Sequence, residues 1–211
     1  LSSSSSGLSA LVKAANELFQ VGKTQSELAQ IAKFASGSSS RSFFGPLAAW
    51  DKDSGEVYQV ETDLKLAMIM LVLTDKKKPV SSRDGMKLCT ETSTSFPEWI
   101  KQSEQDYEDM LGYLKSNDFQ AVGELTEANA LRMHQTTSTA NPPFSYLTDA
   151  SYQAMDKVKA LRASGEQCYF TMDAGPNVKV LCLEEDLDRL ADHFRKDYQV
   201  IVSRTKELPD A

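Results

Sequence analysis

Histidine and cysteine are scarce in this chain of 211 residues, which has two histidines and three cysteines. The cysteines, Cys89, Cys168 and Cys182, are scattered and form no C-x-x-C pair, so the sequence predicts neither a disulfide framework nor a zinc site. We expect free, partly buried thiols in a reducing cytoplasm. The histidines, His134 and His193, stand alone, and a structural metal site is not expected.

The sequence also lacks long apolar runs and an excess of basic residues. Its longest strongly apolar run, Leu66 to Leu73, is too short to span a bilayer and indicates a buried strand. The net charge of −7 argues against nucleic acid as the main partner, because phosphate backbones require a basic surface. A small anionic ligand needs only a local positive site. The uncharged, serine-rich start shows no secretory signal, so we expect a cytoplasmic protein that does not associate with membranes.

The first part of the chain contains patterns of both helices and strands. Apolar residues at helical spacing form one face of a first helix: Leu8, Leu11, Val12, Ala15, Leu18 and Phe19. Thr24 to Glu27 matches a capping box and predicts a second helix from Gln25 to Phe34. A polar loop over Ser36 to Ser42 should follow. We expect strands over 43–50, 56–61 and 66–73, the first two joined by a turn at 51–55.

The second part is mainly helical. We expect helices after Ser82, from Pro97, from Phe119, over 147–163 and over 184–196, with strands on both sides of Asp173 and over 198–202. Interspersed helices and strands indicate an α+β fold, a sandwich of antiparallel sheets and helices. The stretch Lys76-Lys77-Lys78-Pro79 interrupts the pattern. It predicts two domains, 1–78 and 79–211.

The most informative segment is Thr171-Met172-Asp173-Ala174-Gly175-Pro176-Asn177. An apolar run leads to a lone carboxylate, a Gly-Pro turn follows, and a second apolar run begins. This pattern predicts a strand, a tight bend carrying Asp173 and a returning strand. The bend would hold a carboxylate rigidly at the rim of a sheet, where catalytic carboxylates are useful. The alternative is an aspartate that only favours turn geometry.

Four other segments carry residue types suited to anions. The run from Ser2 to Gly7 precedes an apolar helix, whose N-terminal N–H groups favour phosphate, although it also resembles a flexible linker. The segment 36–42 surrounds Arg41 with hydroxyls, and arginine grips carboxylate or phosphate with a planar fork. The segment 81–86, S-S-R-D-G-M, and Arg132-Met133-His134 complete the set. Their structural alternatives are a surface loop, simple N-capping and a helix end.

The order and spacing of these segments closely resemble the diphosphomevalonate decarboxylases, which belong to the superfamily of galactokinase, homoserine kinase, mevalonate kinase and phosphomevalonate kinase. The resemblance runs from Leu1 almost to the last strand. The M-D-A-G-P-N and S-G-S-S-S-R-S pieces are specific to the decarboxylase branch, whereas the serine loop belongs to the whole superfamily. The resemblance implies the two-domain fold of the small-molecule kinases.

The resemblance also implies roles for individual residues. Asp173 would lie against the reacting hydroxyl as a base or as an orienting group, and Arg41 would hold the substrate carboxylate region and Asp173. Ser36, Ser38 and Ser82 would contact the substrate, and Arg132 and His134 would shape the pocket wall. The ATP phosphates would be cradled by the serine loop, with Ser4 as the magnesium ligand: Ser2, Ser3, Ser4, Ser5, Ser6 and Gly7.

The function implied by the resemblance is ATP-dependent decarboxylation of mevalonate diphosphate to isopentenyl diphosphate by a homodimer. Two alternatives remain at this point. A small-molecule kinase of the same superfamily would stop after phosphoryl transfer, and a non-catalytic module would bind phosphate without reaction.

The family carries a further segment before the serine loop, with a lysine- and tyrosine-bearing substrate motif. We therefore expect the first domain of this chain to be incomplete, and the isolated 211-residue chain to be inactive or very weakly active.

Overall fold

The chain divides into two compact units, which are described separately below. A computed structural model describes residues 3–75 and 78–205. The first unit extends to Glu61, and the second comprises Thr62–Arg204. We expected the boundary between residues 78 and 79. The structure instead groups the strand β3 (Leu66–Val72) with the second unit, because β3 is hydrogen-bonded to strands near the C-terminus.

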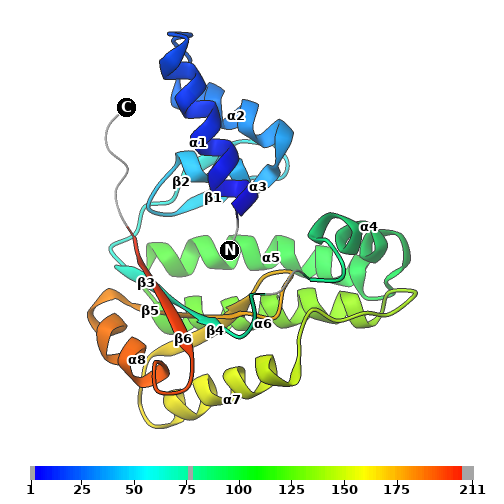
Figure 1. The fold of residues 1–211 in the computed structure, drawn as a ribbon, viewed down its shortest axis with the longest axis vertical. Helices are drawn as coiled ribbons and strands as arrows, with labels where there is room; N and C mark the ends of the chain where they lie inside the picture. Colours follow the sequence, from blue (N-terminus) through cyan, green and yellow to red (C-terminus); the bar gives the residue numbers. More distant parts are fainter. Residues whose placement is uncertain (1–2, 76–77, 206–211) are drawn as a thin grey trace. The chain divides into compact units, whose positions relative to one another are not determined.

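The first unit contains helices and one small hairpin (Figure 1). Its elements are α1 (Ser3–Leu18), α2 (Gln25–Ala35), α3 (Gly37–Ser40), the 3-10 turn η1 (Arg41–Phe43), β1 (Ala48–Trp50) and β2 (Val57–Gln59). The predicted capping box at Thr24 and Glu27 is present, and β1 and β2 pair antiparallel as expected.

Three predictions for the first unit need correction. Residues 37–43 form α3 and η1 rather than a loop, because hydroxyls can bond the backbone locally: Ser40 Oγ donates to the Gly37 carbonyl at 2.8 Å. The strand predicted over 43–50 is therefore shorter, since β1 covers only its last three residues. The predicted inner face of α1 is also largely exposed, with Leu11, Leu18 and Phe19 at 64%, 76% and 73% exposure. Only Val12 of α1 packs against the small described core of this unit, which comprises Leu28, Ala29, Ala32 and Phe43.

The second unit is built on a four-stranded antiparallel sheet in the order β4-β5-β3-β6 (Figure 1). The other strands are β4 (Cys168–Met172), β5 (Val178–Leu183) and β6 (Gln199–Arg204). The helices are α4 (Ser82–Thr92), α5 (Phe96–Lys115), α6 (Phe119–Ser138), α7 (Asp149–Ala163) and α8 (Leu187–Phe194), with the 3-10 turn η2 (Glu184–Asp186) before α8. Each sequence-predicted helix and strand of this part is present, with ends shifted by a few residues.

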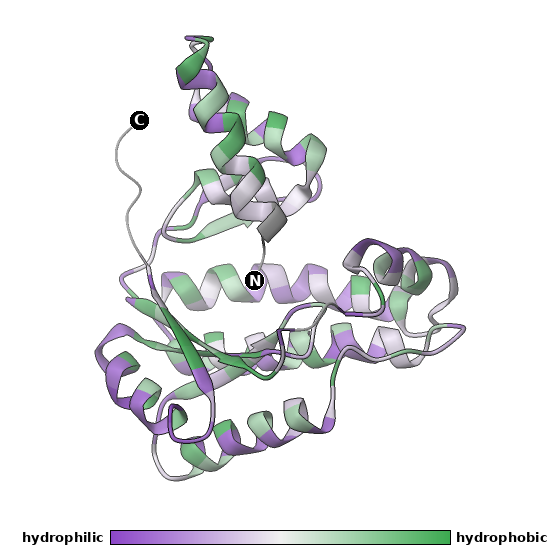
Figure 2. Cartoon of the chain, in the orientation of Figure 1, coloured by the Kyte–Doolittle hydropathy of each residue, from purple (hydrophilic) through white to green (hydrophobic). Residues whose placement is uncertain are grey.

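One face of this sheet carries the main core. Alternate residues of each strand point to one face, and the strands are strongly hydrophobic, as Figure 2 shows. Helices α7 and α8 supply the other side of the core: Ala154, Met155, Val158, Leu187, Leu190, Ala191 and Phe194. On the opposite face, Tyr169 packs edge-on against Phe119 of α6. The sheet is therefore covered by helices on both faces, as an α+β sandwich requires.

The contact between α5 and α6 is not purely apolar. Ile100 of α5 and Leu131 of α6 are exposed. Between α5 and α6 the interior is partly polar instead, because Asp106 is buried and accepts hydrogen bonds from Gln102 and Asn129. Among the helices of the described residues, none is both long and apolar enough to cross a membrane.

Candidate functional site

The predicted bend at Asp173 is present. Strand β4 ends at Met172, β5 begins at Val178, and these two residues are paired across the antiparallel ladder. The five residues between them, Asp173 to Asn177, form a tight turn in which the Gly175 N–H donates to the Asp173 carbonyl at 2.7 Å. The turn therefore presents Asp173 at the rim of the sheet.

The far end of this turn is fixed by Asn177. Its side-chain oxygen accepts from the backbone N–H groups of Leu73 and Thr74 at 2.8 and 3.1 Å, and its amide donates to the Thr74 carbonyl at 3.2 Å. Ser151 of α7 adds a further bond, donating to the Pro176 carbonyl at 2.7 Å. The turn is thus attached both to the end of β3 and to α7, which limits its freedom to move.

The carboxylate of Asp173 is available for chemistry. Its side chain is 66% exposed, and its described ion-pair partner is Lys179 of β5, whose side chain is only 16% exposed. The structure therefore shows an accessible acid on a turn that is hydrogen-bonded to its neighbours.

Lys78 joins a second predicted segment to this turn. Its ammonium donates to Ser82 Oγ at 2.6 Å and to the Ala174 carbonyl at 2.5 Å, and it lies over the Tyr146 ring at 5.2 Å. Ser82, a predicted substrate contact, is thereby placed near the Asp173 turn. The sequence predicts only a domain junction at Lys78, because nothing in a lysine run indicates which ammonium will bind the Asp173 turn.

In the segment 81–86, S-S-R-D-G-M, the first serine has the structural role of N-capping that we gave as the alternative. Ser81 is the N-cap of α4, and its hydroxyl accepts from the Asp84 N–H at 3.1 Å. Its carbonyl accepts from the Tyr146 hydroxyl at 2.9 Å. Ser81 therefore fixes the start of α4, while Ser82 and Arg83 stay exposed.

Arg132 and His134 lie in different surroundings. The guanidinium of Arg132 pairs with the buried Asp106, so it belongs to the polar contact between α5 and α6. His134 is buried at 6% exposure, and its ring is near the main chain of Asp173 and Met172. Burial lowers the pKa of this imidazole, and the main chain nearby opposes that shift.

In the first unit, the structure brings the serine run and the segment 36–42 together. Ser5 donates to the Ser38 carbonyl at 2.9 Å, and its hydroxyl lies 3.2 Å from that of Ser42. The hydroxyls of Ser36 and Ser38 are 3.2 Å apart, and Arg41 is exposed beside them. Two segments far apart in the sequence thus form one hydroxyl-rich surface at the start of α1.

The remaining predicted residues of the serine run are placed as follows. Ser3 and Ser4 begin α1, so the run is the first turns of the helix and not a turn before it. Ser6 and Gly7 follow in the helix and are exposed, while Ser2 and the side chains of Ser3 and Ser4 lie outside the described part of the structure. Asp173 and Arg41 belong to different units, so their meeting in one cleft stays a prediction.

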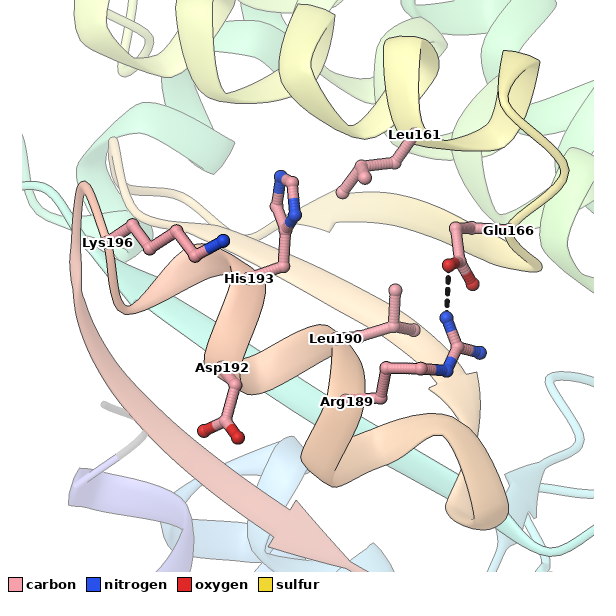
Figure 3. A pocket seen from close by; sticks show the side chains of 7 residues that line it. All are labelled: Leu161, Glu166, Arg189, Leu190, Asp192, His193 and Lys196. Carbon is pink, nitrogen blue, oxygen red and sulfur yellow. Dashed lines mark hydrogen bonds and ion pairs between the residues drawn. The ribbon is translucent and has the colours of Figure 1, made fainter.

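A separate cavity of about 260 Å³ lies between the end of α7 and α8 (Figure 3). Its charged walls are largely neutralised by ion pairs: Arg189 pairs with Glu166 and Asp186, and Asp192 pairs with Arg195. None of the sequence-predicted site residues lines this cavity. The candidate site is therefore at the Asp173 turn and not in this hollow.

Two family models match this chain. Residues 68–209 match the mevalonate 5-diphosphate decarboxylase C-terminal domain, and residues 1–61 match the diphosphomevalonate decarboxylase-like N-terminal domain. The chain is 31% identical over 208 residues to a diphosphomevalonate decarboxylase of Candida albicans, with 94% of this chain covered.

Solved structures show the same similarity. The mevalonate pyrophosphate decarboxylase of Streptococcus pyogenes is 70% identical, with a TM-score of 0.96 and all of this chain covered. A structure of MDDEF in complex with MVAPP, AMPPCP and magnesium is 40% identical, with a TM-score of 0.90 and 97% of this chain covered. The chain spans 58% of the Candida protein, 67% of the Streptococcus chain and 66% of the MDDEF chain.

Proposed function

Because the chain belongs to the mevalonate 5-diphosphate decarboxylase family, we propose that the complete protein converts mevalonate 5-diphosphate to isopentenyl diphosphate while consuming ATP. The observation that carries this proposal is the braced turn of Asp173 to Asn177, which presents an accessible carboxylate at the rim of a sheet. This turn coincides with the M-D-A-G-P-N segment.

The start of α1 suits the phosphates of ATP. A helix of 16 residues beginning at Ser3 offers unpaired N–H groups and the positive end of its dipole, and its first turn carries no acidic residue. The hydroxyl surface of Ser5, Ser38 and Ser42 adds polar groups nearby. These features support the assignment of residues 2–7 to phosphate binding.

A magnesium ion bound with ATP fits the same region. No group of three or more His, Cys, Asp or Glu side chains among the described residues could hold a metal by itself. Magnesium accompanying phosphates requires only one or two protein oxygens, because phosphate oxygens and water complete its shell. We propose Ser4 for this role. When bound, the ion would neutralise the phosphate charge.

The substrate is an anion with a carboxylate and a diphosphate. We propose that the fork of Arg41 binds its carboxylate region, with Ser36 and Ser38 beside it. Ser82, held by Lys78, supplies a further contact near the Asp173 turn. These residues orient the substrate so that its tertiary hydroxyl faces the carboxylate of Asp173.

The order of the chemical steps follows from the quality of the leaving group. Hydroxide leaves a tertiary carbon poorly, whereas phosphate leaves it well. Asp173 orients the hydroxyl or accepts its proton while the oxygen takes the terminal phosphoryl group of ATP. The C–O bond then breaks and inorganic phosphate departs with its electrons. The C–C bond between the substrate chain and its carboxylate breaks as well. The electrons of this bond form the new double bond, and carbon dioxide is released.

We further propose that the complete protein is a cytoplasmic homodimer. The buried free thiols Cys89, Cys168 and Cys182 are compatible with a reducing compartment. Sedimentation of the complete protein measures the oligomeric state directly, and a monomer at micromolar concentration would contradict the dimer.

The decisive experiment is Asp173→Asn in the complete protein. This variant keeps the size of the side chain and removes its charge, so carbon dioxide release should fall by about 1,000-fold while ATP binding is retained. Asp53→Asn, at an exposed position in the β1–β2 turn, is the matched control and should retain full turnover.

The products separate the alternatives. Phosphorylated acceptor without carbon dioxide would indicate a small-molecule kinase, and tight nucleotide binding without ATP consumption would indicate a binding module. Near-normal turnover of Asp173→Asn would defeat the assignment of the carboxylate. We also propose that the isolated 211-residue chain is inactive, which a carbon dioxide assay of that chain tests.

A further inference from the structure

His134 is the most unusual buried polar residue near the candidate site. It lies near the C-terminal end of α6 with only 6% of its surface exposed. Among the described residues, neither of its ring nitrogens has a hydrogen-bond partner of normal geometry. A buried imidazole without partners costs free energy, so its place in the fold calls for an explanation.

The surroundings of His134 show what it faces. The ring packs edge-on against Tyr146, with centroids 6.3 Å apart. The main chain of Asp173 and Met172 lies on another side, close enough to influence the charge of the ring. Helix α6 also packs on β4, the strand that ends at Met172. The ring therefore lies where β4 passes into the Asp173 turn.

The protonation of His134 decides which interaction it offers. Burial favours the neutral form, and a neutral imidazole has one N–H donor and one acceptor nitrogen. A donor at this place can bond a main-chain carbonyl at the end of β4. A small movement of the ring or of the strand would bring such a bond to full strength. Hydrogen bonds in a site are often long without substrate and tighten when the substrate binds.

His134 would complete the attachment of the turn. Asn177 and Ser151 hold its far end, and Lys78 holds Ala174. The near end, where Asp173 leaves β4, has the ion pair to Lys179, but that contact is made by the reactive carboxylate itself. A bond from His134 to the main chain would fix Asp173 and leave its carboxylate free.

We propose that His134 is a positioning residue that holds the main chain at Met172 and Asp173, so that the Asp173 carboxylate stays aligned with the substrate hydroxyl. This role rests on the proposed decarboxylase function. His134 touches no reacting atom, so its loss should lower turnover without weakening the binding of either substrate.

The test uses three substitutions in the complete protein. His134→Phe keeps a ring of similar size and removes both nitrogens. His134→Gln and His134→Asn place an amide N–H near the position of Nε2 and of Nδ1, respectively. His134→Phe should lower kcat by about tenfold or more and keep both KM values within about threefold of those of the unsubstituted protein. The reason is that a misplaced Asp173 carboxylate loses its alignment with the hydroxyl, whereas substrate affinity is retained. One of the two amide variants should restore most of the loss.

The second histidine provides the matched control. His193 lies on α8, away from the Asp173 turn, and lines only the separate cavity of Figure 3. His193→Phe should leave kcat within about twofold of the starting protein. Amide hydrogen exchange is measured for every variant, and His134→Phe should accelerate exchange over residues 173–177 while leaving β3 and β5 protected.

Each outcome decides the proposal. Unchanged kcat in His134→Phe overturns it, and so does a loss that neither amide variant restores. If His134→Phe does not fold, long-range proton–nitrogen NMR of the unsubstituted protein replaces it. One ring tautomer with a slowly exchanging N–H supports the positioning role, and an even mixture of tautomers overturns it. If the unsubstituted protein releases no carbon dioxide, the proposed function fails, and hydrogen exchange still decides whether His134 holds the turn.

Discussion

At the residue scale, two glycines in helices of the second unit differ in what surrounds them. Gly123 of α6 faces the Tyr169 ring, and a Cβ added there would lie 2.0 Å from a ring carbon. Gly112 of α5 is exposed, and an added Cβ would meet nothing within 4 Å. The same substitution should therefore have opposite effects at the two positions.

We expect Gly112→Ala to raise the free energy of unfolding by about 0.5–1 kcal/mol, because alanine is the better helix former. Gly123→Ala should lower it by about 1–3 kcal/mol, because the aromatic ring between α6 and β4 must move. Urea denaturation of the complete protein measures both. Equal effects of the two substitutions would show that Tyr169 does not limit the space at Gly123.

The residue scale also separates roles that looked alike in the sequence. Arg132 and His134 are two positions apart, and we expected both to line a pocket wall. The structure places Arg132 in an ion pair with the buried Asp106, and it places His134 beside the Asp173 turn. Successive positions on a helix point in different directions, so neighbours in a motif can serve different parts of a protein.

At the element scale, the turn between β4 and β5 depends on one side chain. Asn177 makes three hydrogen bonds to the backbone of Leu73 and Thr74. Asn177→Ala would leave these backbone groups without their partner, and we expect a loss of about 1–3 kcal/mol in the free energy of unfolding. Denaturant titration with hydrogen exchange over residues 173–177 measures the effect.

Asn177→Asp provides the graded comparison. Aspartate retains an acceptor for the two N–H groups and loses only the donor to the Thr74 carbonyl. Asn177→Asp should therefore lower the free energy of unfolding by less than Asn177→Ala does. If alanine is tolerated as well as aspartate, Asn177 does not fix the turn.

The sequence correctly predicted the elements whose ends are marked by capping or turn residues. The capping box at Thr24, the Gly-Pro turn after Asp173 and the apolar run that forms β4 each depend on nearby residues. The segment 36–42 lacked such a guide. Its serines favour both loops and short helical turns, and contacts with α1 and α2 accompany the helical form.

At the scale of the whole molecule, the buried histidine links stability to pH. Burial lowers the pKa of His134 below its ordinary value of 6.5. When the pH falls below 6.5, His134 binds a proton in the unfolded chain but stays neutral in the folded protein. The free energy of unfolding therefore decreases with falling pH until the pH is below the lowered pKa. The Asp173 carboxylate and the main chain nearby oppose this effect without reversing it.

We expect the free energy of unfolding of the second unit to fall between pH 7 and the lowered pKa of His134. His134→Gln should make this decline shallower, because glutamine does not titrate. Hydrogen exchange of the α6 amides in urea, repeated over this pH range, measures it. His193→Gln should change the slope less, since its ring is more exposed, and identical slopes in His134→Gln and the unsubstituted protein would refute the link.

The sequence by itself determined the α+β class, the order of the helices and strands, and the turn that carries Asp173, because periodicity, capping and turn chemistry act between residues close in the chain. It also determined the family, through short segments in a fixed order. Only the tertiary structure decided that β3 pairs with β5 and β6, that Lys78 bridges Ser82 and Ala174, and that His134 lies beside Met172 and Asp173. Those contacts join residues far apart in the chain, and their partners are selected by packing and hydrogen-bond geometry that no local pattern encodes.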